Sequence, residues 1–328
     1  MLKLVILIIY FAVLIGIGLY CRKHATDVNG FVLGGRSVGP WLTAFAYGTS
    51  YFSAVVFVGY AGQFGWKYGI AATWAGIGNA IIGSLLAWVI LGRRTRIMSQ
   101  HLDSATMPQY FGKRFGSNPL KIGASVIIFI FLIPYTASLY NGLSRLFGMA
   151  FNIDYSVCII IMATLTAIYV IAGGYMATAI NDFIQGIIML FGIVAVIAAV
   201  IHSKGGFMSA LQGLANVSDP AVSDTPGIFA SFFGPDPFNL LCVVILTSLG
   251  TWGLPQMVQK FYAIDNEASI QKGTVISTIF ALIVSGGCYF LGGFGRLFSD
   301  QIDVKANGFD SIIPTMLSNL SPALIALV

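Results

Sequence analysis

The chain has 328 residues, of which 57% are hydrophobic and only 9% are charged. A soluble domain carries about 25% charged residues, so 12 acidic and 17 basic side chains are too few to cover a water-facing surface of this size. The composition excludes an ordinary soluble enzyme, a disordered chain and a nucleic-acid-binding protein. The net charge of +5 is instead typical of a membrane protein with basic loops on its inner side.

Apolar segments long enough to cross a membrane recur along the chain. A bilayer core about 30 Å thick needs about 20 apolar residues per helix. The pattern predicts eight spans and the beginning of a ninth, which makes residues 1–328 a single all-α transmembrane domain. The spans are Leu2–Tyr20, Pro40–Gly62, Gly69–Leu91, Ile122–Tyr140, Tyr155–Ala172, Ile180–Ile201, Phe238–Phe261 and Gly273–Gly293, and Pro322–Val328 begins the ninth.

The distribution of Lys and Arg predicts the orientation of the spans. Eleven of the 17 bases fall on one set of alternate loops and six on the other, and the densest cluster, Arg93 to Arg96, directly follows the third span. Because basic loops stay in the cytoplasm, we expect a multi-pass protein of the cell membrane with its N-terminus outside. His202–Pro237 is then an outer loop, and the amphipathic segment Asn307–Leu320 lies on the outer surface.

The second span has a polar centre. Five of the seven residues in Tyr47–Ser53 carry hydroxyl groups. Such residues can satisfy carbonyls where a helix unwinds, and unwound carbonyls at the midplane hold Na⁺ in secondary transporters. The alternative is close helix packing through small residues.

The seventh span contains residues that break helices. Gly250, Gly253 and Pro255 lie within six residues, which predicts an interruption beside Trp252 and after the hydroxyls of Thr247 and Thr251. Two interrupted spans in separate parts of a chain indicate a transport site. We expect the two breaks to face each other.

Two charged residues lie at predicted span edges. Asp182 begins the sixth span, where an acid is either functional or a contact at the first turn of a helix. Arg36 follows two glycines and is interpreted as an inner gate or a lipid-headgroup contact. The three histidines and four cysteines form no metal-binding or nucleophilic cluster, so we expect no cofactor, no metal other than sodium and no enzymatic activity.

Several strings resemble the sodium:solute symporter family. They are Gly34-Gly35-Arg36-Ser37-Val38-Gly39-Pro40-Trp41, Thr106-Met107-Pro108-Gln109-Tyr110-Phe111-Gly112-Lys113-Arg114-Phe115, Gly173-Gly174-Tyr175-Met176-Ala177 and Asn181-Asp182-Phe183-Ile184-Gln185-Gly186. They occur in the family's order, and the resemblance extends over essentially the whole chain. The proline and pantothenate permeases are the most similar members.

The resemblance implies a fold of one leading helix followed by two inverted five-helix repeats, the second of them truncated here. It implies Na⁺ as the coupling ion, with Thr49 and Phe52 as carbonyl ligands, Ser53 as a neighbouring hydroxyl and Asp182 on the Na⁺ path. Further Na⁺ ligands belong to the ninth span. The 328 residues alone are therefore expected not to complete the ion site or to drive uptake.

The resemblance also implies the solute-binding and gate positions. They are Tyr51, Val56, Thr247, Thr251, Trp252 and Pro255. Proline permeases have an aspartate where this chain has Tyr51, and sugar transporters have a glutamine where it has Val56. An apolar Val56 argues against a sugar, which needs several hydrogen-bonding partners.

The resulting hypothesis is a Na⁺-coupled symporter of a small organic solute that works by alternating access, with sodium, the solute and the lipid bilayer as its partners. Two alternatives stay open: a transporter-like sensor module that feeds a signalling domain, and a truncated fragment that does not transport. The sequence does not specify the solute.

Overall fold

Helices make up all the regular structure in the residues that the computed structural model describes, which are 2–151, 153–318 and 320–327. The predicted all-α class is confirmed for that part of the chain. The α-helices are α1 Leu2–Cys21, α2 Val28–Leu33, α3 Pro40–Tyr51, α4 Ala61–Tyr68, α5 Thr73–Gly78, α6 Arg93–His101, α7 Met107–Phe115, α8 Asn118–Phe151, α9 Tyr155–Ser203, α10 Phe207–Ala215, α11 Pro237–Leu249, α12 Pro255–Ala263, α13 Glu267–Gly292, α14 Val304–Asn307, α15 Ile312–Ser318 and α16 Pro322–Leu327. The 3₁₀ and π helices are η1 Arg22–His24, η2 Gly34–Arg36, η3 Val55–Tyr60, η4 Gly69–Ala72, η5 Asn79–Leu86, η6 Trp88–Gly92, η7 Ile228–Ala230, η8 Gly295–Gln301 and η9 Phe309–Ser311.

These helices follow the predicted spans. The second span is divided among α3, η3 and α4, the third continues from α5 through η6, and the seventh is divided between α11 and α12. Four helices in the described residues are long and apolar enough to cross a membrane: Val55–His101, Asn118–Gly148, Tyr155–Ser203 and Glu267–Gly292. The chain is therefore a multi-pass membrane protein. The predicted beginning of a ninth span, Pro322–Val328, coincides with α16, and its last residue, Val328, lies outside the described residues.

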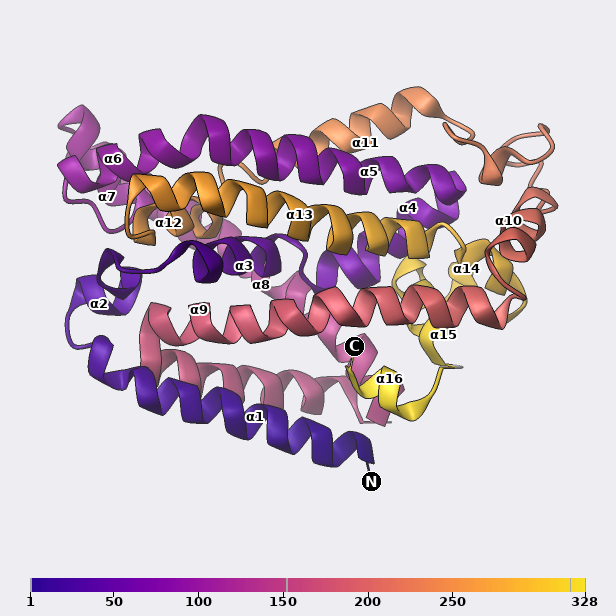
Figure 1. Cartoon of the computed structure of the whole chain (residues 1–328), viewed down its shortest axis with the longest axis horizontal. Helices are drawn as coiled ribbons and strands as arrows, with labels where there is room; N and C mark the ends of the chain where they lie inside the picture. The colour runs from indigo at the N-terminus through magenta and orange to yellow at the C-terminus, as the bar shows by residue number, and fades with distance from the viewer. Residues whose placement is uncertain (1, 152, 319, 328) are drawn as a thin grey trace.

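The fifth and sixth spans form a hairpin within α9. Gly174 interrupts the helical backbone with φ +58° and ψ −151°, and Figure 1 shows two neighbouring limbs that join at one end, with α1 beside the first. A Cβ atom at Gly174 would lie 2.8 Å from the carbonyl oxygen of Phe31. The positive φ and the close approach both require glycine here.

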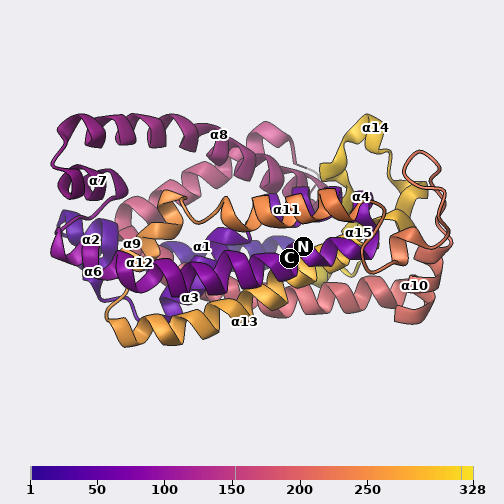
Figure 2. The same ribbon diagram turned by 90° about the horizontal axis from the view of Figure 1, so that it is seen from above.

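The loops sort to two opposite ends, as the base distribution predicts. Figures 1 and 2 both place α2, α6, α7 and α12 at one end of the molecule and α10 and α14 at the other. The basic Arg93–Arg96 cluster and Lys113 therefore share an end, opposite the His202–Pro237 loop. We call the first the inner end and the second the outer end, following the predicted orientation.

α13 is the packing centre of the bundle. It contacts α3, α4, α5, η5 and α9. The backbones approach closely at glycines: a Cβ atom on Gly65 would lie 2.0 Å from the carbonyl group of Gly292, and one on Gly76 would lie 2.6 Å from the Cα atom of Gly286. Small residues allow this contact where lipid gives helices no hydrophobic reason to associate.

Asn307–Leu320, predicted to lie on the outer surface, has exposed residues and one apolar face that packs into the protein. Ile312, Ile313, Met316 and Leu317 are buried in the main core. α15 enters the bundle because its apolar face packs against α4, η3, η8 and α8. Sequence amphipathicity identified that face but not its partner.

The orientation can be tested by cysteine labelling in a background without the four native cysteines. Arg94→Cys and Asp224→Cys replace exposed residues at the inner and outer ends. We expect a membrane-impermeant maleimide to label position 224 in intact cells and position 94 only after permeabilisation. The cysteine-free chain is the control, and the reverse labelling pattern would invert the topology.

Substitution at the α4–α13 contact should be costly. Gly65→Ala places a methyl group against the Gly292 backbone, and overpacking of this kind costs about 1–3 kcal/mol, so the melting temperature should fall. Gly123→Ala in α8 is the matched control, because nothing lies within 4 Å of its Cβ position. Equal melting temperatures for the two variants would contradict this packing.

Candidate functional site

The second span is interrupted where its hydroxyl-rich centre predicts. α3 ends at Tyr51, and Phe52 leaves the helical region with φ −98° and ψ 60°. The amides of Val56 and Phe57 both donate to the carbonyl of Ser53. Among the described residues, no backbone amide donates to the carbonyl oxygens of Thr49 or Phe52. These two oxygens are those that the family resemblance assigns to Na⁺, and that assignment stays a prediction.

The seventh span is also interrupted as predicted. α11 ends at Leu249, two turn-like hydrogen bonds follow (Trp252 N to Leu249 O and Leu254 N to Thr251 O), and α12 begins at Pro255. Pro255 suits the first helical position because it has no N–H to satisfy. The helix therefore restarts cleanly on the inner side of the break.

Tyr51 joins the two interrupted spans. Its hydroxyl lies 2.9 Å from the carbonyl oxygen of Thr247, to which it donates. The hydroxyls of Ser248 and Thr251 lie near the Tyr51 hydroxyl. The expectation that the two breaks face each other is confirmed by these contacts.

Asn79 is hydrogen-bonded to several of the polar groups around this junction. The Thr247 and Ser248 hydroxyls each donate to Asn79 Oδ1 at 3.1 Å, and Asn79 Nδ2 donates to Ser285 Oγ at 3.3 Å. Tyr51 Oη lies 3.2 Å from the same Oδ1 atom. The network links the second, third, seventh and eighth spans. Sequence reasoning missed Asn79, although a lone buried amide in an apolar span is itself a signal of function.

The remaining predicted solute positions lie against neighbouring helices. Trp252 Nε1 donates to the carbonyl oxygen of Ile82 at 3.0 Å, so the indole packs on η5. Val56 is buried in the main core, and Thr251 donates to the Ser248 carbonyl. Ser53 is half-buried at the break. Their roles in binding a solute stay predictions.

Asp182 does not begin a helix. The second limb of α9 starts after Gly174, so Asp182 lies two turns inside it, and the interpretation as a first-turn contact is wrong. Its carboxylate Oδ2 atom lies 3.5 Å from the ammonium of Lys260 on α12. The Thr49 side chain lies near the same carboxylate, and its hydroxyl donates to the Phe45 carbonyl at 3.0 Å. Asp182 therefore faces both interrupted spans from α9.

Two arginines connect segments of the inner end by hydrogen bonds. Arg36 donates to the carbonyl oxygens of Ser99, Ser104 and Tyr262, at 2.9 Å for Ser104. Arg96 donates to the backbone of the 264–265 turn. Burial lowers the pKa of the Arg36 guanidinium, and the nearby Asp103 and Tyr262 oppose this effect. A lipid-headgroup contact is therefore not the role of Arg36, since its donors are used inside the protein.

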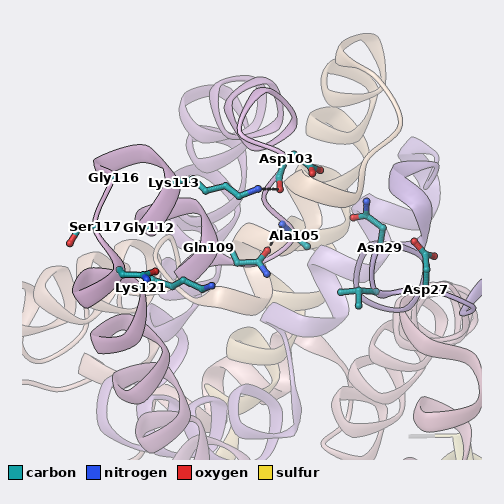
Figure 3. Close-up of a pocket in the computed structure, with 12 residues that line it drawn as sticks. Asp27, Asn29, Asp103, Ala105, Gln109, Gly112, Lys113, Gly116, Ser117 and Lys121 are labelled. Carbon is teal, nitrogen blue, oxygen red and sulfur yellow. Dashed lines mark hydrogen bonds between the residues drawn. The ribbon is translucent and has the colours of Figure 1, made fainter.

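A polar pocket of about 660 Å³ opens at the same end. Figure 3 shows it between the start of α2, the turn before α7 and the junction of α7 and α8, with Lys113 donating to the Asp103 carbonyl. None of the predicted site residues lines it. The pocket is separate from the interrupted spans.

Comparison with known proteins agrees with this geometry. The model of the sodium:solute symporter family matches residues 31–327. The chain belongs to the sodium:solute symporter family. The osmoregulated proline transporter OpuE of Bacillus subtilis is 29% identical over 299 residues, which cover 90% of this chain and 59% of OpuE. The sodium/proline symporter of Staphylococcus aureus is 29% identical over 326 residues, covering 95% of this chain and 60% of that protein.

The fold matches a solved structure of the same kind. A Na⁺-coupled sialic acid symporter in a substrate-bound outward-open state superimposes with a TM-score of 0.76 at 17% identity. The match covers 100% of this chain and 67% of the symporter. The chain spans 59–60% of the length of the two transporters named above.

The Asp182–Lys260 pair gives a stability prediction. Asp182→Asn leaves the Lys260 ammonium without its counter-charge, which is strongly destabilising for a buried pair, so the melting temperature should fall. Adding Lys260→Gln removes that ammonium and should restore part of the loss, because contacting residues are not additive. Additive melting-temperature changes in the double variant would mean that the two groups do not interact.

Proposed function

We propose that the protein carries a small organic solute together with Na⁺ across the cell membrane, and that the solute is proline or a compound of similar size and charge. The family and the names of the two transporters, both described as carrying proline, support this proposal. The N-terminus is proposed to lie outside, because the base-rich loops fall at the opposite end.

The observation that carries the proposal is the junction of two broken helices. Tyr51 of one and Thr247 of the other are hydrogen-bonded, while no backbone amide in the described part of the chain donates to the carbonyls of Thr49 and Phe52. Carbonyl groups unpaired in a membrane are costly unless a ligand or ion meets them. An ion and a solute that bind at such a junction supply those partners.

Each predicted residue has a role in this proposal. Na⁺ binds at the second-span break, with Asp182 on its path to the inner end. The solute binds between the breaks. Its binding and gate residues are Tyr51, Val56, Thr247, Thr251, Trp252 and Pro255. Because the Tyr51 hydroxyl and the Trp252 indole already contact backbone carbonyls, they position the breaks as well as line the space between them.

Coupling follows from alternating access to one site. Na⁺ stabilises the state open to the outside, the solute then binds, and the loaded protein opens inward. One charge that crosses 100 mV is worth about 2.3 kcal/mol, which is enough to concentrate a solute by more than one order of magnitude. The Arg36 and Arg96 hydrogen bonds close the inner end in the outward-facing half of this cycle.

Uptake of labelled proline into proteoliposomes that hold the intact protein tests this function. We expect uptake with an inward Na⁺ gradient and none with an equal K⁺ gradient. Asp182→Asn should raise the half-saturating Na⁺ concentration about tenfold, as expected for loss of a charged ligand worth about 1.4 kcal/mol, with little change in solute preference. Trp252→Ala should weaken solute binding and leave the Na⁺ dependence nearly unchanged.

Gly123→Ala in lipid-facing α8 serves as the control for handling and insertion, and its uptake should match that of the parent. If proline uptake ignored the Na⁺ gradient, the coupling ion would be wrong. If no uptake occurred for proline but occurred for another small solute, only the solute assignment would fail. Equal effects of both substitutions on Na⁺ and solute would contradict the division of roles.

A further inference from the structure

Three charged side chains are buried in the described part of the chain: Arg96, Lys260 and Arg296. Two of them have several close acceptors. Arg96 donates to two backbone carbonyls and to Gln100, and Arg296 donates to the Trp66 carbonyl and to Asp219 at 2.9 Å. The several donors of a planar guanidinium group bind these acceptors at once, so each arginine charge is held in a fixed position.

Lys260 is held much more loosely. An ammonium group has three donors, yet among the described residues its only recorded acceptor is Asp182 Oδ2, at 3.5 Å. The ring of Tyr175 lies 5.1 Å from the same nitrogen. The side chain is 8% exposed, so water supplies few partners. A buried cation with one long contact is poorly anchored compared with the two arginines.

The carboxylate faces a second set of groups. The Thr49 side chain lies close enough to influence the Asp182 carboxyl, and among the described residues no backbone amide donates to the Thr49 carbonyl oxygen at the break. Asp182 therefore lies between the second-span break, where Na⁺ is proposed to bind, and the lysine of the seventh span. The ammonium occupies a position beside the carboxylate that a mobile cation would need.

We propose that Lys260 is a tethered cation that competes with Na⁺ for Asp182. This inference rests on the proposed function and adds a residue that sets its ion affinity. When Na⁺ is absent, the ammonium neutralises the carboxylate. When Na⁺ arrives, like-charge repulsion and the weak anchoring of Lys260 displace the ammonium along its flexible four-carbon stem.

The competition keeps the charge at Asp182 constant throughout the cycle. Without Lys260, the ion-free protein would have to change from the inward-open to the outward-open state with an unpaired carboxylate inside the membrane, which is costly. With Lys260, one cation replaces another. The same competition weakens the apparent affinity for Na⁺, because only the fraction of molecules with an uncovered carboxylate can bind the ion.

Equilibrium binding of ²²Na⁺ to the purified intact protein tests the proposal without a solute. Lys260→Gln should lower the half-saturating Na⁺ concentration about threefold, the change expected if Lys260 covers Asp182 about two-thirds of the time. Lys260→Arg keeps the charge and should stay at or above the half-saturating concentration of the parent. Lys272→Gln, an exposed lysine of α13, is the matched control and should leave binding unchanged.

The outcomes separate this inference from the proposed function. Parent protein that binds no Na⁺ would overturn both. Na⁺ binding by the parent with an unchanged or weaker affinity in Lys260→Gln would overturn the competition alone. If Lys260→Gln does not fold, Lys260→Arg decides: tighter Na⁺ binding in that variant would mean that packing rather than charge controls the site, and the inference would be wrong.

Discussion

A helix that breaks inside a membrane must find new partners for its backbone, because no water is present to supply them. This constraint organises the centre of the molecule. At the second-span break, the Ser53 carbonyl accepts two backbone amides, while no amide within residues 2–151, 153–318 and 320–327 donates to the Thr49 and Phe52 carbonyls. The Tyr51 hydroxyl satisfies a carbonyl of the other broken span, and Asn79 collects the hydroxyls beside it.

The buried and half-buried charged side chains at the two ends of the molecule make different contacts from those near the breaks. At the two ends, Arg36, Arg96 and Arg296 are bonded to several carbonyls or carboxylates, so each holds loops together. Near the breaks, the Lys260–Asp182 pair has one contact of 3.5 Å. Several short hydrogen bonds to one arginine suit a contact that holds an end of the protein closed. A single long contact suits an ion pair whose cation can be exchanged for another. The distribution of contacts therefore separates structural charges from those available to a mobile ion.

The sequence predicts what is local. Hydropathy identifies the spans, and the composition of residues 47–53 and 250–255 identifies both breaks, because glycine, proline and hydroxyl residues act on their own backbone. It does not predict which elements meet. Asn79, Lys260 and the buried face of α15 gain their significance only from partners in other spans, far along the chain. Asp182 was misplaced within its helix because the turn at Gly174 lies several residues before the apolar run begins.

Rigid and movable parts can be distinguished by how closely backbones approach. Gly65 and Gly292 leave no space for α4 to slide along α13, so those helices must move together. The inner half of the seventh span has different ties: Val38 exchanges backbone hydrogen bonds with residues 263 and 265, which links the start of the second span to the end of α12. Both segments lie on the inner side of their breaks. If access to the site alternates as proposed, the two segments would move as one unit, with the breaks as hinges. Lys260 of α12, which lies beside Asp182, would move with that unit.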